Sequence, residues 1–102
     1  MELLDNITGF EWGEGNINKN WVKHKVSNSE CEEIFFYEPS IGEDTKHSKA
    51  EKRYAAYGMT ANGRYLTIIF TVRNDKIRVI SARDQQKKEK AEYEKNQKNT
   101  KI

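Results

Sequence analysis

A predicted β-hairpin in the second half of the chain is the feature that most constrains the fold. β-Branched residues are concentrated in Tyr65–Val72 and Lys76–Ala82, and Asn74 and Asp75 between them favour a two-residue turn. Because cross-strand partners share a face, this turn leaves one face entirely apolar, made of Leu66, Ile68, Phe70, Val72, Ile77 and Val79. Such a face requires a helix packed over it.

The opposite face of the hairpin carries positive charge near the turn. The same register pairs Arg73 with Lys76 and Thr71 with Arg78, which brings three cations together on adjacent strands. An arginine guanidinium binds phosphate through two parallel hydrogen bonds, so the pattern favours contact with an RNA backbone. Surface charges on an ordinary solvated strand pair would produce the same pattern.

The segments on either side of the hairpin predict three helices. The first covers Asn16 to His24. The second has Ser27 as its N-cap, with Glu30 completing a capping box, and it ends before Pro39. The third covers Arg83 to Lys95, which is highly charged and has almost no apolar stripe. A helix of this kind packs weakly or needs a partner.

A further strand precedes the hairpin and completes a three-stranded antiparallel meander. It runs from about Lys52 to Tyr57, and Asn62-Gly63 marks the turn that follows. Residues 38–50 predict an exposed loop, and Phe10–Trp12 predicts a short extended segment. The expected fold class is therefore α+β, with N-terminal helices on a small antiparallel sheet, a short N-terminal strand and a C-terminal helix.

Composition narrows the class of protein further. A chain of 102 residues forms one domain, with a core expected over about residues 8–95 and a frayed C-terminal tail. One cysteine rules out an internal disulfide, which favours a cytoplasmic location, and no apolar stretch is long enough to span a membrane. Residues 1–50 contain 5 Lys/Arg and 10 Asp/Glu, whereas residues 51–102 contain 13 and 6. The second half is therefore the natural contact for a polyanion.

The histidines and the cysteine show no metal-ligand spacing. His24 and His47 lie far apart and Cys31 has no partner cysteine, so neither a metal nor a cofactor is expected. Cys31 falls on the buried stripe of the second predicted helix, which favours core packing over a role as nucleophile. Glu51 and Arg53 form either a solvated charge pair or a carboxylate placed beside the arginines for acid–base chemistry.

Several short segments, taken in order, resemble the BrnT family of bacterial toxins. They are Phe10-Glu11-Trp12, Asn16 and Asn20, Lys23-His24-Lys25-Val26-Ser27, His47-Ser48, Glu51 with Arg53-Tyr54, Gly63-Arg64-Tyr65-Leu66, Thr71-Val72-Arg73, Ile77–Arg83, and Glu89 with Tyr93-Glu94. No single motif is decisive, but their order and spacing are specific over roughly residues 10–94. The chain departs from the family at Lys25, where glycine is common.

This resemblance implies a RelE-like fold and a function as the ribonuclease toxin of a type II toxin–antitoxin system. The implied reaction is metal-independent attack of a ribose 2′-OH on the adjacent phosphate, with inhibition of translation as the result. The implied partner is a BrnA-type antitoxin, which forms a hetero-oligomer with the toxin and alone contacts operator DNA. No cofactor and no membrane are implied.

The resemblance also suggests site residues. Arg73, Arg78 and Arg83 would bind the scissile and flanking phosphates. His24 or Glu51 would act as the base, and His47 as the acid. The expected additional RNA contacts are Lys23, Arg53, Arg64 and Lys76.

Two alternatives remain open from the sequence. One is a non-catalytic basic module that binds nucleic acid or a partner. The other is a degenerate toxin that is retained as an operon co-repressor.

Overall fold

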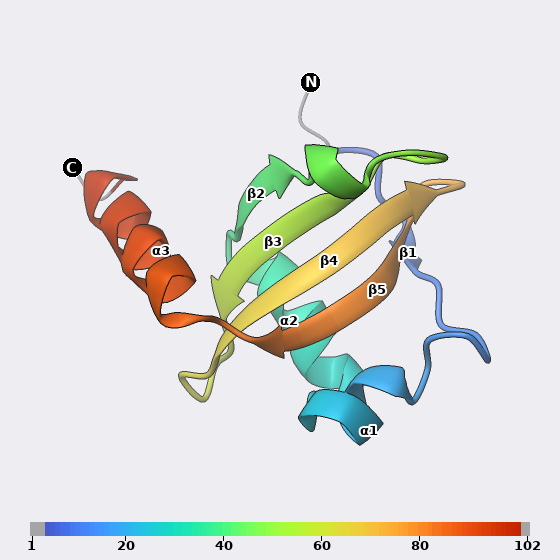
Figure 1. Ribbon diagram of the computed structural model, residues 1–102, viewed down its shortest axis with the longest axis horizontal. Helices are drawn as coiled ribbons and strands as arrows, with labels where there is room; N and C mark the ends of the chain where they lie inside the picture. Colours follow the sequence, from blue (N-terminus) through green and yellow to red (C-terminus); the bar gives the residue numbers. More distant parts are fainter. Residues whose placement is uncertain (1–3, 101–102) are drawn as a thin grey trace.

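The computed structural model describes residues 4–100 and contains a mixed five-stranded sheet with three α-helices (Figure 1). The strands are β1 (Gly9–Phe10), β2 (Ser40–Glu43), β3 (Tyr54–Met59), β4 (Tyr65–Arg73) and β5 (Lys76–Asp84), in the spatial order β1-β5-β4-β3-β2. The helices are α1 (Lys19–His24), α2 (Asn28–Phe36) and α3 (Lys87–Thr100), with a single 3₁₀ turn η1 (Thr45–His47). β1 pairs parallel to β5, and the remaining neighbours are antiparallel.

The α+β class and the central meander β3-β4-β5 are confirmed, but the expected small antiparallel sheet is wrong in two respects. The predicted loop at residues 38–50 contains β2, which pairs with β3. The N-terminal strand is present but parallel, so the sheet is mixed and differs in detail from the RelE-like arrangement we expected. β2 has weak strand character of its own, with Ile41 as its one large apolar residue, and its conformation depends on pairing with β3.

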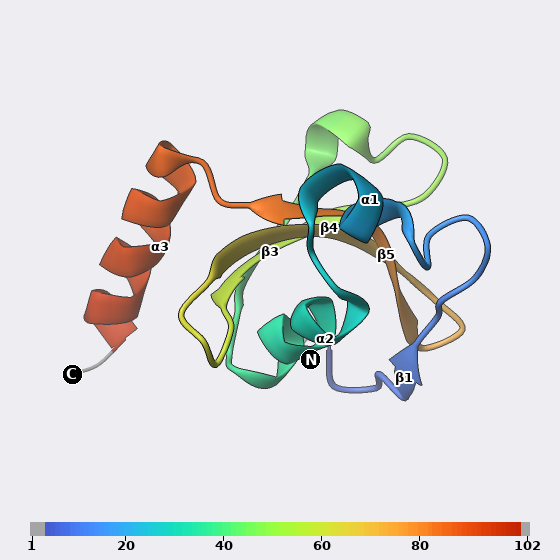
Figure 2. The ribbon, with the colours of Figure 1, turned by 90° about the horizontal axis from the view of Figure 1, so that it is seen from below.

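The sequence predicts a helix over the apolar face of the hairpin, and in the structure this helix is α2. Figure 2 shows α2 on one side of the sheet, with α1 and the segment around η1 on the other. Ser27 caps α2 and forms the expected capping box with Glu30. The core between helix and sheet consists mainly of fully buried side chains, among them Cys31, Ile34, Leu66, Ile68, Phe70 and Val79.

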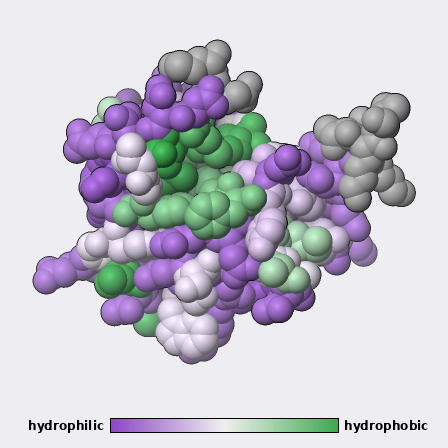
Figure 3. Space-filling view, turned by 180° about the vertical axis from the view of Figure 1, so that it is seen from behind, coloured by the Kyte–Doolittle hydropathy of each residue, from purple (hydrophilic) through white to green (hydrophobic). Residues whose placement is uncertain are grey.

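Apolar surface is also visible on the α2 side of the molecule (Figure 3). Phe36 is 71% exposed, and it borders a cavity of about 400 Å³ that Leu4, Ile7, Phe10 and Phe35 also line. Phe10 contacts both Phe35 and Phe36 edge-to-face. This patch lies on the side of the sheet opposite the site described below.

β1 pairs with only part of the outer edge of β5. Side chains from the α1 region form hydrogen bonds with backbone groups along the rest of that edge. The predicted helix at residues 16–24 begins later, at Lys19, and the preceding turn buries Asn16. Asn16 Nδ2 donates to the Val79 carbonyl at 3.0 Å, and Asn20 Oδ1 accepts from the Ala82 N–H at 2.9 Å. These amides replace a neighbouring strand and protect the edge of the sheet.

The C-terminal helix begins four residues later than predicted, because β5 continues to Asp84. It extends to Thr100, past the predicted limit at Lys95, and the end of the predicted frayed tail lies outside the described residues. Tyr93 is its one buried hydrophobic side chain among those described. No helix within residues 4–100 is both long and apolar enough to cross a membrane.

Lys25 closes α1 in a left-handed conformation, with φ of 55° and ψ of 38°. Glycine adopts this conformation without the steric cost of a Cβ atom. We expect Lys25→Gly to raise the free energy of unfolding by about 0.5–1 kcal/mol. This net value includes the loss of the exposed contact between Lys25 Nζ and the Trp21 ring, which partly offsets the relief of backbone strain. Urea denaturation measures the change. Lys23→Gly, inside the same helix, should instead lower the value by about 1 kcal/mol, and equal losses in both variants would contradict the argument.

Candidate functional site

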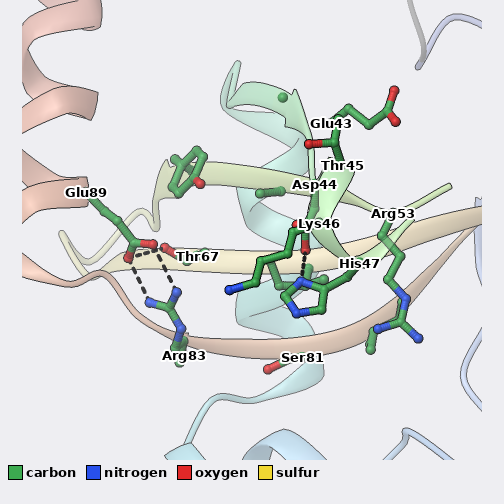
Figure 4. Close-up of a pocket in the computed structure, with 15 residues that line it drawn as sticks. Glu43, Asp44, Thr45, Lys46, His47, Arg53, Thr67, Ser81, Arg83 and Glu89 are labelled. Atoms are coloured by element: carbon green, nitrogen blue, oxygen red, sulfur yellow. Dashed lines mark hydrogen bonds and ion pairs between the residues drawn. The ribbon is translucent and has the colours of Figure 1, made fainter. Parts of the chain in front are cut away.

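A groove lies on the face of the sheet opposite α2 (Figure 4). Its main cavity has a volume of about 540 Å³. Side chains of β3, β4 and β5 form the floor, residues 42–47 form one wall, and Glu89 at the start of α3 forms the other. The floor includes Tyr57, Thr67 and Ser81, and the charged groups around it are Lys46, His47, Arg53 and Arg83.

Two smaller cavities extend this groove toward the β4–β5 turn, with volumes of about 320 and 170 Å³. Arg53 lines all three cavities. Together they are lined by seven lysines and arginines, against four carboxylates. The groove therefore carries net positive charge and suits an extended anionic chain.

A β-bulge determines which arginines reach this groove. The predicted pairing of Thr71 with Arg78 is confirmed, and Asn74 and Asp75 form the two-residue turn with positive φ. The register shifts between Ile69 and Phe70, so that β5 contains one extra residue before Arg83. Regular pairing would place Arg83 on the core face, whereas the bulge returns it to the groove face that holds Arg78.

The three arginines that the sequence suggests as phosphate ligands are all ion-paired. The pairs are Arg73 with Glu51, Arg78 with Glu11 and Arg83 with Glu89, with shortest N–O distances of 2.7, 2.8 and 2.7 Å. Hydrogen bonds from Arg73 hold the pKa of the Glu51 carboxyl below its usual value. An RNA phosphate would have to compete with a carboxylate for each of these guanidinium groups.

Arg53 differs from the other arginines. The chain has five, all within residues 4–100, and Arg53 alone has no carboxylate partner in that range. Its side chain is half-buried at the junction of the three cavities. Its hydrogen-bond donors are therefore available to a phosphate without the displacement of a bound carboxylate.

His47 is held beside Arg53 by an acidic neighbour from the same loop. Its Nδ1 lies 2.9 Å from Asp44 Oδ2, whereas no residue within 4–100 bonds Nε2. The carboxylate fixes the ring orientation and favours a proton on Nδ1, which leaves Nε2 free for proton transfer. The side chain is 57% exposed, so a ligand in the groove has access to it.

Sequence reasoning missed several of the groove residues. Asp44 orients His47 and could have been identified from the spacing of the two residues in the chain. Tyr57 lies on the floor, where burial raises the pKa of its hydroxyl. Lys46 and Ser81 also line the main cavity, but nothing in their sequence context distinguishes them from ordinary surface residues.

Arg64, expected to contact RNA, instead joins the N-terminal helices to the sheet. It donates to Asp84 at 2.7 Å, to the Lys25 carbonyl at 2.7 Å and to Glu30 at 3.2 Å. It also donates to the carbonyl of His24. These bonds use the whole guanidinium, so a structural role explains this residue.

The remaining expected residues lie outside the groove. Lys23 and His24 are exposed on α1, and Lys76 is exposed next to the β4–β5 turn. None of them lines the three cavities. The structure thus brings together His47, Glu51, Arg53, Arg73, Arg78 and Arg83, and it separates Lys23, His24, Arg64 and Lys76 from them.

The Arg83–Glu89 pair predicts a specific pH dependence of stability. Hydrogen bonds from Arg83 lower the pKa of Glu89 from 4.5 to about 2. A carboxyl whose pKa is lower in the folded state stabilises the fold above its unfolded pKa, and this contribution is lost as the pH falls from 4.5 toward 2. Wild type should therefore be more stable than Glu89→Gln at pH 7, and the difference should shrink across that range. Urea unfolding at stepped pH measures it, and a pH-independent difference would contradict the assignment.

Residues 4–100 contain no cluster of three or more His, Cys, Asp or Glu side chains that could hold a metal ion. Cys31 is buried in the core, and burial raises the pKa of its thiol to about 12. A thiol of this kind is a poor nucleophile.

Comparison with known protein families identifies a match over most of the chain. A family model described as the ribonuclease toxin BrnT of a type II toxin–antitoxin system matches residues 12–89. The matched region includes every residue that lines the groove, and it begins one residue after Glu11, the carboxylate partner of Arg78. No curated protein matches the chain.

Proposed function

The chain belongs to the BrnT family of ribonuclease toxins of type II toxin–antitoxin systems, and on that premise we propose that the groove described above binds and cleaves RNA without a metal. The observation that carries the proposal is the position of His47 next to the unpaired Arg53 in a groove of net positive charge. A proton carrier and a phosphate ligand are the two components that this reaction needs.

Arg53 makes the first contact with the phosphate in this proposal. Its free guanidinium binds the scissile phosphate and stabilises the charge that develops when the 2′-OH attacks. Arg78 and Arg83 lie on the same face of β5 and bind the flanking phosphates by exchanging their carboxylate partners for RNA. Arg73 has the same exchange available with Glu51.

The proton transfers fall to His47 and Glu51. Of the two proposed bases, His24 lies outside the groove, whereas Glu51 lines two of its cavities. The ionised Glu51 carboxylate accepts the 2′-OH proton as the oxygen attacks phosphorus. His47, protonated on Nε2, gives a proton to the departing 5′ oxygen, which leaves a 2′,3′-cyclic phosphate and a 5′-hydroxyl.

The biological role follows the family. A type II toxin is neutralised by a protein, and the proposed partner is a BrnA-type antitoxin that forms a hetero-oligomer with this chain and alone contacts operator DNA. The proposed effect of RNA cleavage in the cytoplasm is inhibition of translation. The apolar patch near Phe36 and the weakly packed α3 both leave surface for a partner.

The test is cleavage of single-stranded RNA by the purified protein in EDTA, with analysis of the product ends. We expect cyclic phosphate and 5′-hydroxyl ends, and no cleavage of the same oligonucleotide with 2′-O-methyl groups throughout. His47→Ala protein prepared in parallel controls for a contaminating ribonuclease. Absence of cleavage of both naked and ribosome-bound RNA would overturn the proposal and favour a non-catalytic binding module. Cleavage only after addition of a divalent metal would overturn metal independence.

A further inference from the structure

The two edges of the sheet differ in how their backbone groups are satisfied. At the β5 edge, Glu11 N–H donates to the Ile77 carbonyl, and the amides of Asn16 and Asn20 bond the carbonyl of Val79 and the N–H of Ala82. Lys19 Nζ reaches the Ile80 carbonyl as well. At the β2 edge, no strand or side chain within residues 4–100 forms corresponding hydrogen bonds with the outward backbone groups.

The register identifies the free groups on β2. The Asp44 N–H donates to the Arg53 carbonyl, so residue 44 belongs to a hydrogen-bonded pair. Such pairs alternate along antiparallel strands, and the N–H and C=O groups of the intervening residues point away from the partner strand. Ile41 and Glu43 therefore direct two donors and two acceptors outward, along one line at the edge of the sheet.

A cleft runs along this edge between β2 and α3, with a volume of about 420 Å³. Figure 1 shows α3 standing beside the sheet on the β2 side. Ser40, Ile41, Tyr57 and Tyr93 line the inner part of the cleft, and Lys88 and Glu92 of α3 line its outer wall. Most of its exposed wall surface is apolar. Of the two residues with outward backbone groups, Ile41 lines the cleft, whereas Glu43 lines the adjoining main cavity of the groove.

From these features we infer that the cleft is the docking site for an extended segment of the antitoxin, which adds to the sheet as a sixth strand next to β2. Backbone groups of the segment pair with Ile41 and Glu43, and its alternate side chains, which are apolar, pack against Tyr57 and Tyr93. A strand is the form of peptide that satisfies an open sheet edge. The inference deepens the proposed function, because it rests on the proposed antitoxin partner.

The position of the cleft accounts for neutralisation of the ribonuclease. Gly42, Tyr57 and Glu89 line both the cleft and the main cavity of the groove. A strand held at the β2 edge therefore adjoins the proposed RNA site, and residues that flank it reach the wall formed by Glu43 to His47. A second copy of this chain fits less well, since its own β2 is accompanied by α3.

Glu43 offers a matched pair of variants for the test. Glu43→Pro removes the outward N–H and leaves the bonds between β2 and β3 in place, because the proline nitrogen faces away from β3. Glu43→Ala removes the same exposed side chain but keeps the N–H. The probe is the purified BrnA-type antitoxin of the same operon, and the readouts are its affinity for the full-length chain and amide hydrogen exchange of Ile41 and Glu43 in the wild-type complex.

We expect Glu43→Pro to weaken the complex by roughly tenfold or more and Glu43→Ala to leave its affinity within about twofold of wild type. Both amides should become protected from exchange in the wild-type complex. Equal affinities of the two variants with unprotected Ile41 and Glu43 amides would overturn the docking site, as would protection caused by dimerisation of the free chain. Circular dichroism of each variant establishes that β2 mutation has not unfolded the protein. Cleavage of RNA by the free chain is measured separately, so a failure of the proposed ribonuclease function is distinguishable from a failure of this site.

Discussion

Replacement of His47 by alanine should reduce the rate of RNA cleavage by about 10²–10⁴-fold, with little change in RNA affinity. The expected size is that of losing one general acid or base from an active site. The imidazole lies in the main cavity with Nδ1 held by Asp44 and with Nε2 free, which is the arrangement that proton transfer requires. Single-turnover cleavage and a separate RNA-binding measurement distinguish loss of chemistry from loss of binding.

The chain contains its own matched control. His24→Ala removes the only other histidine, which is exposed at the end of α1 and lines none of the groove cavities. Its cleavage rate should stay within about threefold of wild type, in the range of an ordinary surface substitution. A large loss in His24→Ala together with an active His47→Ala would move the proton carrier to α1 and contradict the groove assignment. Asp44→Asn should reduce the rate by less than His47→Ala, because it removes the orienting charge but keeps the imidazole.

Local patterns were sufficient to predict the hairpin and the start of α2. Asn74-Asp75 and the flanking apolar alternation specify the β4–β5 register over the first four pairs, and Ser27 with Glu30 specifies the helix start. Each of these signals involves residues close together in the chain. They also predict that a helix covers the apolar face, and the structure shows that this helix is α2.

The parts of the fold that the sequence did not predict depend on contacts between segments that are distant in the chain. β2 has little strand character and forms because β3 offers it a partner. The bulge between Ile69 and Phe70 has no glycine to announce it, and yet it decides which face of the sheet Arg83 occupies. A regular extrapolation of the hairpin therefore misplaces a proposed phosphate ligand.

The candidate site also depends on contacts between distant segments, which local sequence patterns do not predict. The sequence correctly gathers arginines on one face of the hairpin, but it cannot show that Glu11 reaches Arg78 across 67 positions of the chain or that Glu51 reaches Arg73. These ion pairs decide which arginine is available to a phosphate, because within residues 4–100 Arg53 is the one arginine that no carboxylate pairs with. The sequence also does not distinguish Arg64 from the arginines of the groove, although Arg64 binds Asp84 and main-chain carbonyls instead.

The fold itself should be most sensitive to loss of Phe70. Phe70 is fully buried at the centre of the interface between α2 and the sheet, with its ring centroid 5.0 Å from that of Phe35 and 5.6 Å from that of Tyr54. We expect Phe70→Ala to lower the free energy of unfolding by about 3–5 kcal/mol, since it removes a large buried ring and leaves a cavity between elements that cannot close around it. Small domains are stable by only about 5–15 kcal/mol, so the variant should be partly unfolded near 37 °C. Urea denaturation followed by circular dichroism measures the loss.

Ile69→Ala, at the next position but on the half-buried groove face, should lower stability by only about 1 kcal/mol, because its side chain is already partly in water. Equal losses at the two positions would mean that the core does not lie on the α2 side of the sheet.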